Sequence, residues 1–146
     1  MTLLLALLAC QGAPPAATSV VQVAPLPGVD PAPTALKLYT VTWKTDPRPL
    51  PLSTLFEIEA TLTDAKGAPV EDAKVRIDAR MPQHGHGMAT RPEDDEGVCD
   101  AAGACTHPGG VYRTRGMKFH MPGEWSLRFD VDGPAGTDHL LVPVQL

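Results

Sequence analysis

Positive charge is scarce in this sequence: 12 Lys and Arg side chains are outnumbered by 17 Asp and Glu, and the formal net charge is -5 over 146 residues. The chain therefore lacks the usual electrostatic footprint for nucleic acid, and no nucleic-acid partner is expected. Patterns typical of long helices are also absent. Instead, 16 prolines and 13 glycines separate short apolar alternations, which favours many short strands in a single domain.

Long hydrophobic runs are absent too. The apolar N-terminus, residues 1–10, is far shorter than the ~20 residues that cross a bilayer as a helix. Its last four residues, Leu7-Leu8-Ala9-Cys10, resemble the bacterial lipobox, in which the cysteine is lipidated and becomes the first residue of the mature protein. We expect residues 1–10 to be a lipoprotein signal peptide. Cys10 would then anchor the protein to a membrane of the bacterial cell envelope, facing the periplasm or the cell surface. A first strand of the sheet is the alternative for this segment.

Cysteine is rare, with three residues in all. Once Cys10 is assigned to lipid, Cys99 and Cys105 remain as a pair, and an oxidising compartment would let them form a disulfide. A zinc site is the weaker alternative, because their spacing exceeds that of a zinc-binding pair and no second pair exists. Residues 11–35 contain six prolines and a single charge. This composition predicts an extended tether, in which only residues 20–23 could form a short edge strand.

Alternating apolar and polar residues predict strands over most of the remaining chain. The clearest example is residues 73–81, whose apolar members alternate with charged ones. Comparable segments occur at 36–45, 52–63, 111–119, 124–132 and 139–145. Their spacing predicts an all-β domain at residues 36–146, an antiparallel immunoglobulin-like β-sandwich of about seven strands. Met81 and Met117 lie on or beside inward-facing rows and are expected in the core.

Residues 90–110 are expected to form a long loop that carries the cysteine pair and the acidic run Glu93-Asp94-Asp95-Glu96. A loop of this length is uncommon without structure of its own, and the disulfide would restrain it. Calcium binding is the weaker explanation of the acidic run, since it lacks the Asp-x-Asp-x-Asp-Gly order of a calcium loop. We expect these carboxylates to be solvated surface charges.

Histidine and methionine concentrate in two segments. Residues 81–88 read Met-Pro-Gln-His-Gly-His-Gly-Met, and residues 117–122 read Met-Lys-Phe-His-Met-Pro; together they hold three of the five histidines and four of the five methionines. Residues two apart in an extended segment project to the same side, so His84, His86 and Met88 are expected to face one way. The second segment ends in a turn, which would bring its histidine to a loop end of the sandwich.

Imidazole and thioether groups without carboxylate or free thiol form a ligand set suited to copper, and Met sulfur favours Cu(I). Zinc sites rarely use Met. The candidate metal ligands are, in chain order, His84, His86, Met88, His120 and Met121. The alternative is structural: a histidine that satisfies a backbone carbonyl and methionines that fill the core.

Catalysis has little support in the sequence. It shows no nucleophile with a nearby base signature and no Gly-rich phosphate loop, so we expect a protein that is not an enzyme. Two function classes lead: a lipoprotein that binds or delivers copper at the cell envelope, and a structural or partner-binding envelope module without metal. A metal-dependent enzyme is the least favoured of the three function classes. An envelope protein is the kind of partner that either leading class would have.

A family resemblance is carried by residues 81–92, Gly110-Val-Tyr112 and the run Gly116-Met-Lys-Phe-His-Met-Pro-Gly-Glu-Trp125. These motifs resemble the YtkA-like family of exported bacterial domains, related in pattern to the FixH proteins, over roughly residues 37–146. The resemblance implies an immunoglobulin-like sandwich and a role in copper handling or membrane oxidase biogenesis. Carried over residue by residue, it selects His84, His86, Met88, His120, Met121 and Trp125. The cysteine-containing insertion between Pro92 and Tyr112 departs from the family pattern.

Overall fold

The computed structural model describes residues 31–146. The expected signal peptide with Cys10, and the tether as far as residue 30, including the segment 20–23, lie outside the described residues. Within the described range, no helix is long and apolar enough to cross a membrane. The only helical element there is the 3-10 turn η1, Pro108–Gly110.

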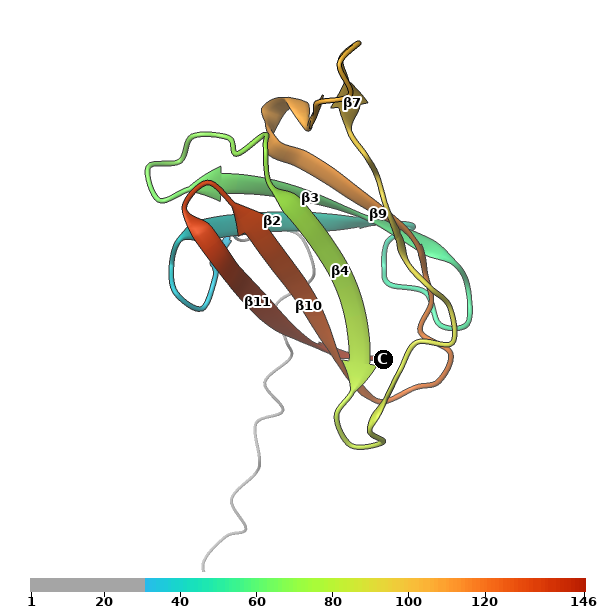
Figure 1. Ribbon diagram of the computed structural model, residues 1–146. Coiled ribbons are helices and arrows are strands. Elements are labelled where there is room, and N and C mark those ends of the chain that lie inside the picture. Colours follow the sequence, from blue (N-terminus) through green and yellow to red (C-terminus); the bar gives the residue numbers. More distant parts are fainter. Residues whose placement is uncertain (1–30) are drawn as a thin grey trace, which may run out of the picture.

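The described chain forms two antiparallel sheets packed face to face, with a separate two-stranded hairpin (Figure 1). One sheet has the order β1-β2-β3-β9-β6, the other the order β11-β10-β4-β5, and β7 pairs only with β8. The bounds are β1 Ala32–Pro33, β2 Tyr39–Asp46, β3 Phe56–Asp64, β4 Lys74–Met81, β5 His86–Gly87, β6 Glu93–Asp94, β7 Val98–Cys99, β8 Cys105–Thr106, β9 Val111–Met117, β10 Glu124–Gly133 and β11 Gly136–Gln145. The predicted all-β, antiparallel β-sandwich is confirmed.

The core fills the space between the two sheets, and it follows the alternation in the sequence. In β4 every second residue is buried and its neighbours are exposed, and β10 repeats the pattern beside it. Each large apolar side chain buried this way stabilises the fold by about 1.5–3 kcal/mol. Met81 and Met117, predicted to be in the core, are 1% and 0% exposed. The largest side chains that are almost fully buried are Trp125, Tyr39, Phe119, Phe129, Ile58 and Leu62.

The folded unit begins before residue 36. Ala32 and Pro33 pair with β2, so the last residues of the expected tether belong to a sheet edge. Behind them, the buried carboxylate of Asp138 accepts hydrogen bonds from the amides of Leu36 and Leu38 at 3.0–3.2 Å. Burial alone would raise the pKa of Asp138, but hydrogen bonds with the Thr34 side chain and with backbone amides outweigh it and lower the pKa to about 2.

Three predicted strands start three or four residues away from the expected position, and a local turn explains each. The strand expected from residue 36 starts at Tyr39, because the chain turns at Lys37, which has φ 61°. The strand expected from residue 52 starts at Phe56, because Ser53 has φ 60°, a left-handed conformation that interrupts an extended strand. The strand expected from residue 139 starts at Gly136, which pairs directly with Gly133 across a two-residue turn.

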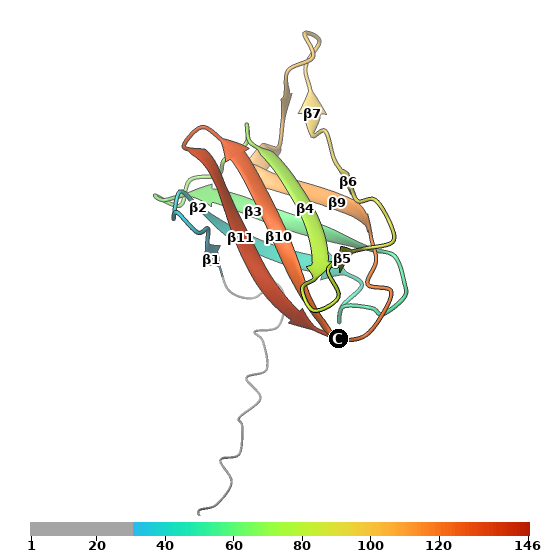
Figure 2. The ribbon, with the colours of Figure 1, turned by 60° about the horizontal axis from the view of Figure 1, so that its bottom comes forward.

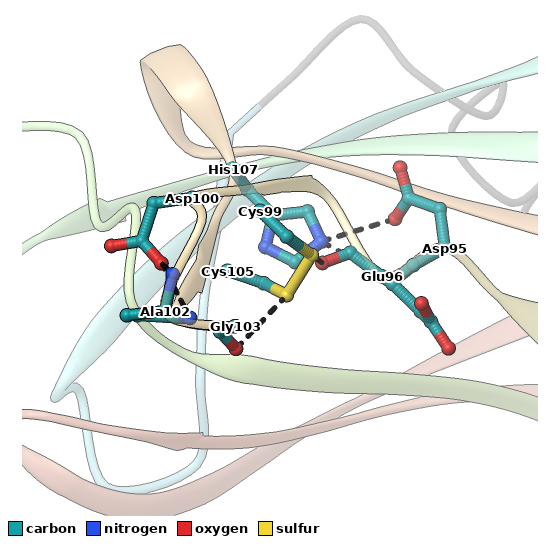
Figure 3. The surroundings of a disulfide bond; sticks show 9 residues. Asp95, Glu96, Cys99, Asp100, Ala102, Gly103, Cys105 and His107 are labelled. Atoms are coloured by element: carbon teal, nitrogen blue, oxygen red, sulfur yellow. Dashed lines mark hydrogen bonds and ion pairs between the residues drawn. A yellow bond between two sulfur atoms is a disulfide. The ribbon is translucent and has the colours of Figure 1, made fainter.

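The segment 90–110 is not one structureless loop. Its residues Glu93 and Asp94 form β6, which pairs with the edge of β9. The acidic run is only partly solvated, since Asp94 accepts a hydrogen bond from the Thr114 hydroxyl at 2.6 Å and Asp95 accepts one from the Arg113 amide at 3.0 Å. Beyond it, β7 and β8 form a hairpin that projects from the sandwich. The predicted disulfide between Cys99 and Cys105 is confirmed there (Figure 3).

Candidate metal site

The first histidine segment is a tight hairpin between β4 and β5. The Met81 carbonyl accepts hydrogen bonds from the amides of His84 at 3.2 Å and Gly85 at 3.0 Å, and Met81 pairs with His86 across the turn. Gly85 has φ 68°, a left-handed conformation that glycine adopts without strain. The extended arrangement expected for residues 84–88 is therefore wrong at His84, which lies in the turn and not in a strand.

The second segment connects β9 to β10 at the same end of the sandwich. Phe119 is fully buried and anchors this connection, while His120 remains partly exposed beside it. Trp125, at the start of β10, donates a hydrogen bond from its indole nitrogen to the Met121 carbonyl at 3.1 Å. This bond fixes the connection against the four-stranded sheet. Figure 2 shows β5 beside the end of β4 and close to the C-terminus, while β7 projects at the other end.

The two segments meet through their imidazole rings. The ring centroids of His84 and His86 are 5.7 Å apart, and those of His86 and His120 are 5.2 Å apart. His86 is thus the middle ring of three. Two imidazoles that bind one ion, each through a nitrogen about 2 Å from it, have centroids roughly 5–6 Å apart. The spacing of these rings is compatible with shared binding of an ion.

Hydrogen bonding leaves suitable nitrogen atoms free. The Nδ1 atom of His86 lies 3.0 Å from the Gly87 carbonyl oxygen, which can only accept, so Nδ1 is the donor of this hydrogen bond and Nε2 is the nitrogen that a neutral ring would offer to an ion. The Nδ1 atom of His120 is buried and has no hydrogen-bond partner among residues 31–146. A buried nitrogen of this kind normally finds a partner, and a bound ion is one way to satisfy it. His84 is exposed and lies at the solvent side of the cluster.

Trp125 forms the inner wall of the cluster. Its ring meets His120 at 5.4 Å and His86 at 6.2 Å, in both cases edge to face. Since Trp125 is fully buried, it holds these two imidazoles against the core and not against solvent. The sequence selected this residue only through the family resemblance.

The two methionines expected in the site are partly buried and pack against the core. The Met88 sulfur accepts a hydrogen bond from the Lys118 amide at 3.4 Å, which links the two histidine segments directly. Met121 contributes its carbonyl to Trp125. Within residues 31–146, no three His, Cys, Asp or Glu side chains converge as a ready-made metal site. The structure instead places His86 close to His84 on one side and to His120 on the other, while Met88 and Met121 belong to the same two segments and pack against the core.

Backbone contacts that the sequence did not reveal support the second segment. The Ser53 amide donates to the Phe119 carbonyl at 2.7 Å, and Leu52 forms a bridge with Phe119. The segment before β3 therefore covers the connection that carries His120. No local pattern predicts this contact, because its partners come from distant parts of the chain.

A family model described as YtkA-like matches residues 35–130 of the chain. No curated protein sequence matches the chain. The matched range contains both histidine segments and Trp125, and it covers well over half of the 146 residues. The chain belongs to the YtkA-like family.

Proposed function

We propose that this chain is an exported bacterial lipoprotein that binds copper and serves in copper handling or delivery at the cell envelope. The observation that carries the proposal is the approach of His86 and His120, whose centroids are 5.2 Å apart at one end of the sandwich. His84 would complete a set of three imidazoles, and Met88 and Met121, from the same two segments, would add soft donors.

The donor types favour copper over other metals. Imidazole binds both copper states, and thioether sulfur selects Cu(I). Calcium and magnesium prefer oxygen ligands, which the histidine cluster does not offer. The cysteine thiols, which would favour zinc, are joined in a disulfide on the projecting hairpin. Copper is therefore the metal that best fits these residues.

The graded exposure of the three imidazoles suits release as well as binding. His84 is exposed in a turn, whereas His86 and His120 are partly buried against Trp125. An exposed ligand on a turn is the easiest to exchange for a ligand of a partner protein. The inner pair would retain the ion until that exchange is under way. This order is what a delivery protein needs, and it requires no catalytic step.

The proposed location depends on the N-terminal residues. Lipidation at Cys10 would anchor the chain, and the Pro-rich tether would let the site reach an envelope partner. In this arrangement the folded domain stays outside the bilayer and binds no nucleic acid. Its net charge of -5 fits that expectation.

A Cu(I) competition titration tests the proposal. The chain without its signal peptide, with Cys10→Ser to avoid an extra thiol, is titrated against a chromogenic Cu(I) chelator under anaerobic conditions. One tightly bound Cu(I) per chain is expected, and Zn(II) should bind more weakly. Failure to compete with the chelator, in a chain with a normal circular dichroism spectrum, would favour the structural or partner-binding module instead.

A further inference from the structure

The disulfide lies on a hairpin that is separate from both sheets. In the described part of the chain β7 and β8 pair only with each other, and Cys99 stands directly opposite Cys105 in their register. All residues from 96 to 106 are exposed, including both cysteines. Figures 1 and 2 show β7 projecting away from the end that carries the histidines. Neither cysteine belongs to the core cluster of residues 31–146, and the disulfide is open to attack from solvent.

The base of the hairpin is held without the disulfide. His107 is buried, its amide donates to the Glu71 carbonyl at 2.8 Å, and its Nε2 lies 3.2 Å from an Asp95 carboxylate oxygen (Figure 3). The His107 ring stacks on Tyr112 with centroids 4.0 Å apart. Just before β7, a Cβ added to Gly97 would collide with the Thr106 carbonyl. Only glycine therefore allows the two sides of the hairpin to approach this closely. Opening the disulfide leaves all of these contacts in place.

The tip of the hairpin also has its own support. The Asp100 carboxylate accepts hydrogen bonds from the amides of Ala102 and Ala104, both at 2.9 Å, and the Asp100 amide donates to the Ala104 carbonyl at 2.9 Å. This turn keeps the two strands together when the sulfurs are not bonded. Two thiols held in register can close again, so the disulfide can open and re-form.

From these observations we infer that the Cys99–Cys105 hairpin is a thiol–disulfide exchange site for a dithiol protein, independent of the histidine cluster. A thiolate of the partner attacks one sulfur, forms a mixed disulfide and releases the other cysteine as a thiolate, which takes up a proton. The partner's second thiol then attacks the mixed disulfide. The products are two thiols on this chain and a disulfide on the partner, and two electrons have passed from the partner. The reverse sequence reoxidises the hairpin.

Val98 supplies the contact that a protein partner would use. It is 65% exposed and directly precedes Cys99. A protein partner can bury an apolar side chain that lies beside the reacting sulfur, and this burial favours the complex. A small thiol reagent buries little of the side chain, so its reaction rate does not depend on it. Replacement of Val98 therefore separates docking of a protein from simple chemical access.

The first experiment measures reduction of the native, folded chain by dithiothreitol. A synthetic peptide of residues 97–107 with the same disulfide is the reference for full access. We expect the two second-order rate constants to agree within about threefold, because neither sulfur is covered. The amide NMR spectrum should change only near residues 96–107. The inference would be overturned if the chain were reduced at least about 100-fold more slowly than the peptide, or only on global unfolding. Either result would assign the disulfide a purely structural role.

The second experiment uses thioredoxin as the dithiol protein. We expect it to reduce the native chain faster than dithiothreitol does at equal concentration, and Val98→Ser to slow thioredoxin several-fold while leaving the dithiothreitol rate unchanged. A Cys105→Ser chain, with Cys10 also replaced and Cys99 carried as a mixed disulfide with thionitrobenzoate, should exchange with a thioredoxin that lacks its resolving cysteine: the thioredoxin thiolate bonds to the Cys99 sulfur and thionitrobenzoate leaves as a coloured thiolate. A thioredoxin rate below that of dithiothreitol, or no mixed disulfide, would contradict a protein partner.

Discussion

His86 and His120 lie with their ring centroids 5.2 Å apart, although one follows the β4 hairpin turn and the other precedes β10. The contact exists because β4 and β10 are neighbours in one sheet and their connected segments meet at its end. Trp125 contacts both rings from within the core. The fold thus joins two sequence segments into one cluster through strand pairing and core packing.

The first prediction tests whether the two segments share an ion. His120→Ala and His86→Ala should each lower Cu(I) affinity by about 100-fold or more, since loss of a mere supporting residue already costs 10–100-fold at metal sites. His86→Ala should have the larger effect, because its ring is the middle one of three. A competition titration with a Cu(I) chelator gives the affinities.

The matched control for these variants is His139→Ala. His139 lies in β11 opposite Asp130, toward the turn at the far end of the hairpin from the cluster. Its replacement should leave Cu(I) affinity unchanged. If His120→Ala behaves like this control while circular dichroism shows a normal fold, the shared site is wrong and His84 with His86 is at most a loose surface ligand pair.

The second prediction concerns the thioethers. Met88→Leu should weaken Cu(I) binding more than Zn(II) binding, because it removes a soft sulfur donor and retains most of the apolar volume. Met117→Leu is the control: this residue is 0% exposed, and its change should leave both affinities unaltered. Parallel titrations with the two metals decide the matter. An equal loss for both metals would assign Met88 to positioning, through its bond from the Lys118 amide, and not to ligation.

The third prediction concerns stability and acid. The pKa of Asp138 is lowered from 3.8 to about 2 in the fold, so the carboxylate stabilises the folded state above pH 4 and this contribution is lost as the pH falls from about 4 to about 2. Its size is about 2 kcal/mol at neutral pH. Asp138→Asn should remove roughly that amount in urea unfolding at pH 7 and flatten the pH dependence between 4 and 2. Asp132→Asn, at an exposed position, should do neither.

The sequence predicted the core of the fold because strand alternation is local information. In β4 and β10 the buried face follows directly from the order of apolar and charged residues. Pairings that need a distant partner escaped this reasoning: β6 is a strand only because the edge of β9 accepts it, and β1 is one only because β2 does. Neither segment has an apolar alternation of its own.

The sequence indicated which residues make up the candidate site, but not how the chain arranges them. The spacing of His84 and His86 in an extended chain suggested a common side, whereas four residues from Pro82 to Gly85 turn the chain between two paired residues, Met81 and His86. The cluster still forms, because the turn places His84 beside His86 at 5.7 Å. The contact with His120 could be expected only after two predicted strands were placed in one sheet.

The fourth prediction concerns anchoring. Expressed from its full sequence in a bacterium that processes lipoproteins, the chain should appear in the membrane fraction, with a diacylglyceryl-modified Cys10 as its N-terminal residue by mass spectrometry. Cys10→Ser should move the protein to the soluble fraction or leave it unprocessed. A soluble protein that retains Met1 would contradict both the signal peptide and the anchor.

The last prediction uses Trp125 as a reporter of the site. Its ring lies 5.4 Å from that of His120 and 6.2 Å from that of His86, so a Cu(II) ion bound by these imidazoles should quench its fluorescence. The second tryptophan, Trp43, lies in β2 of the other sheet, and its ring contacts that of Phe129 in a tilted arrangement with centroids 5.7 Å apart. In Trp125→Phe the remaining emission should therefore be much less sensitive to Cu(II), and in Trp43→Phe the quenching should persist. This variant pair separates binding at the histidine cluster from binding elsewhere on the surface. Equal quenching of both tryptophans would contradict a copper site beside Trp125, even if the chain binds copper.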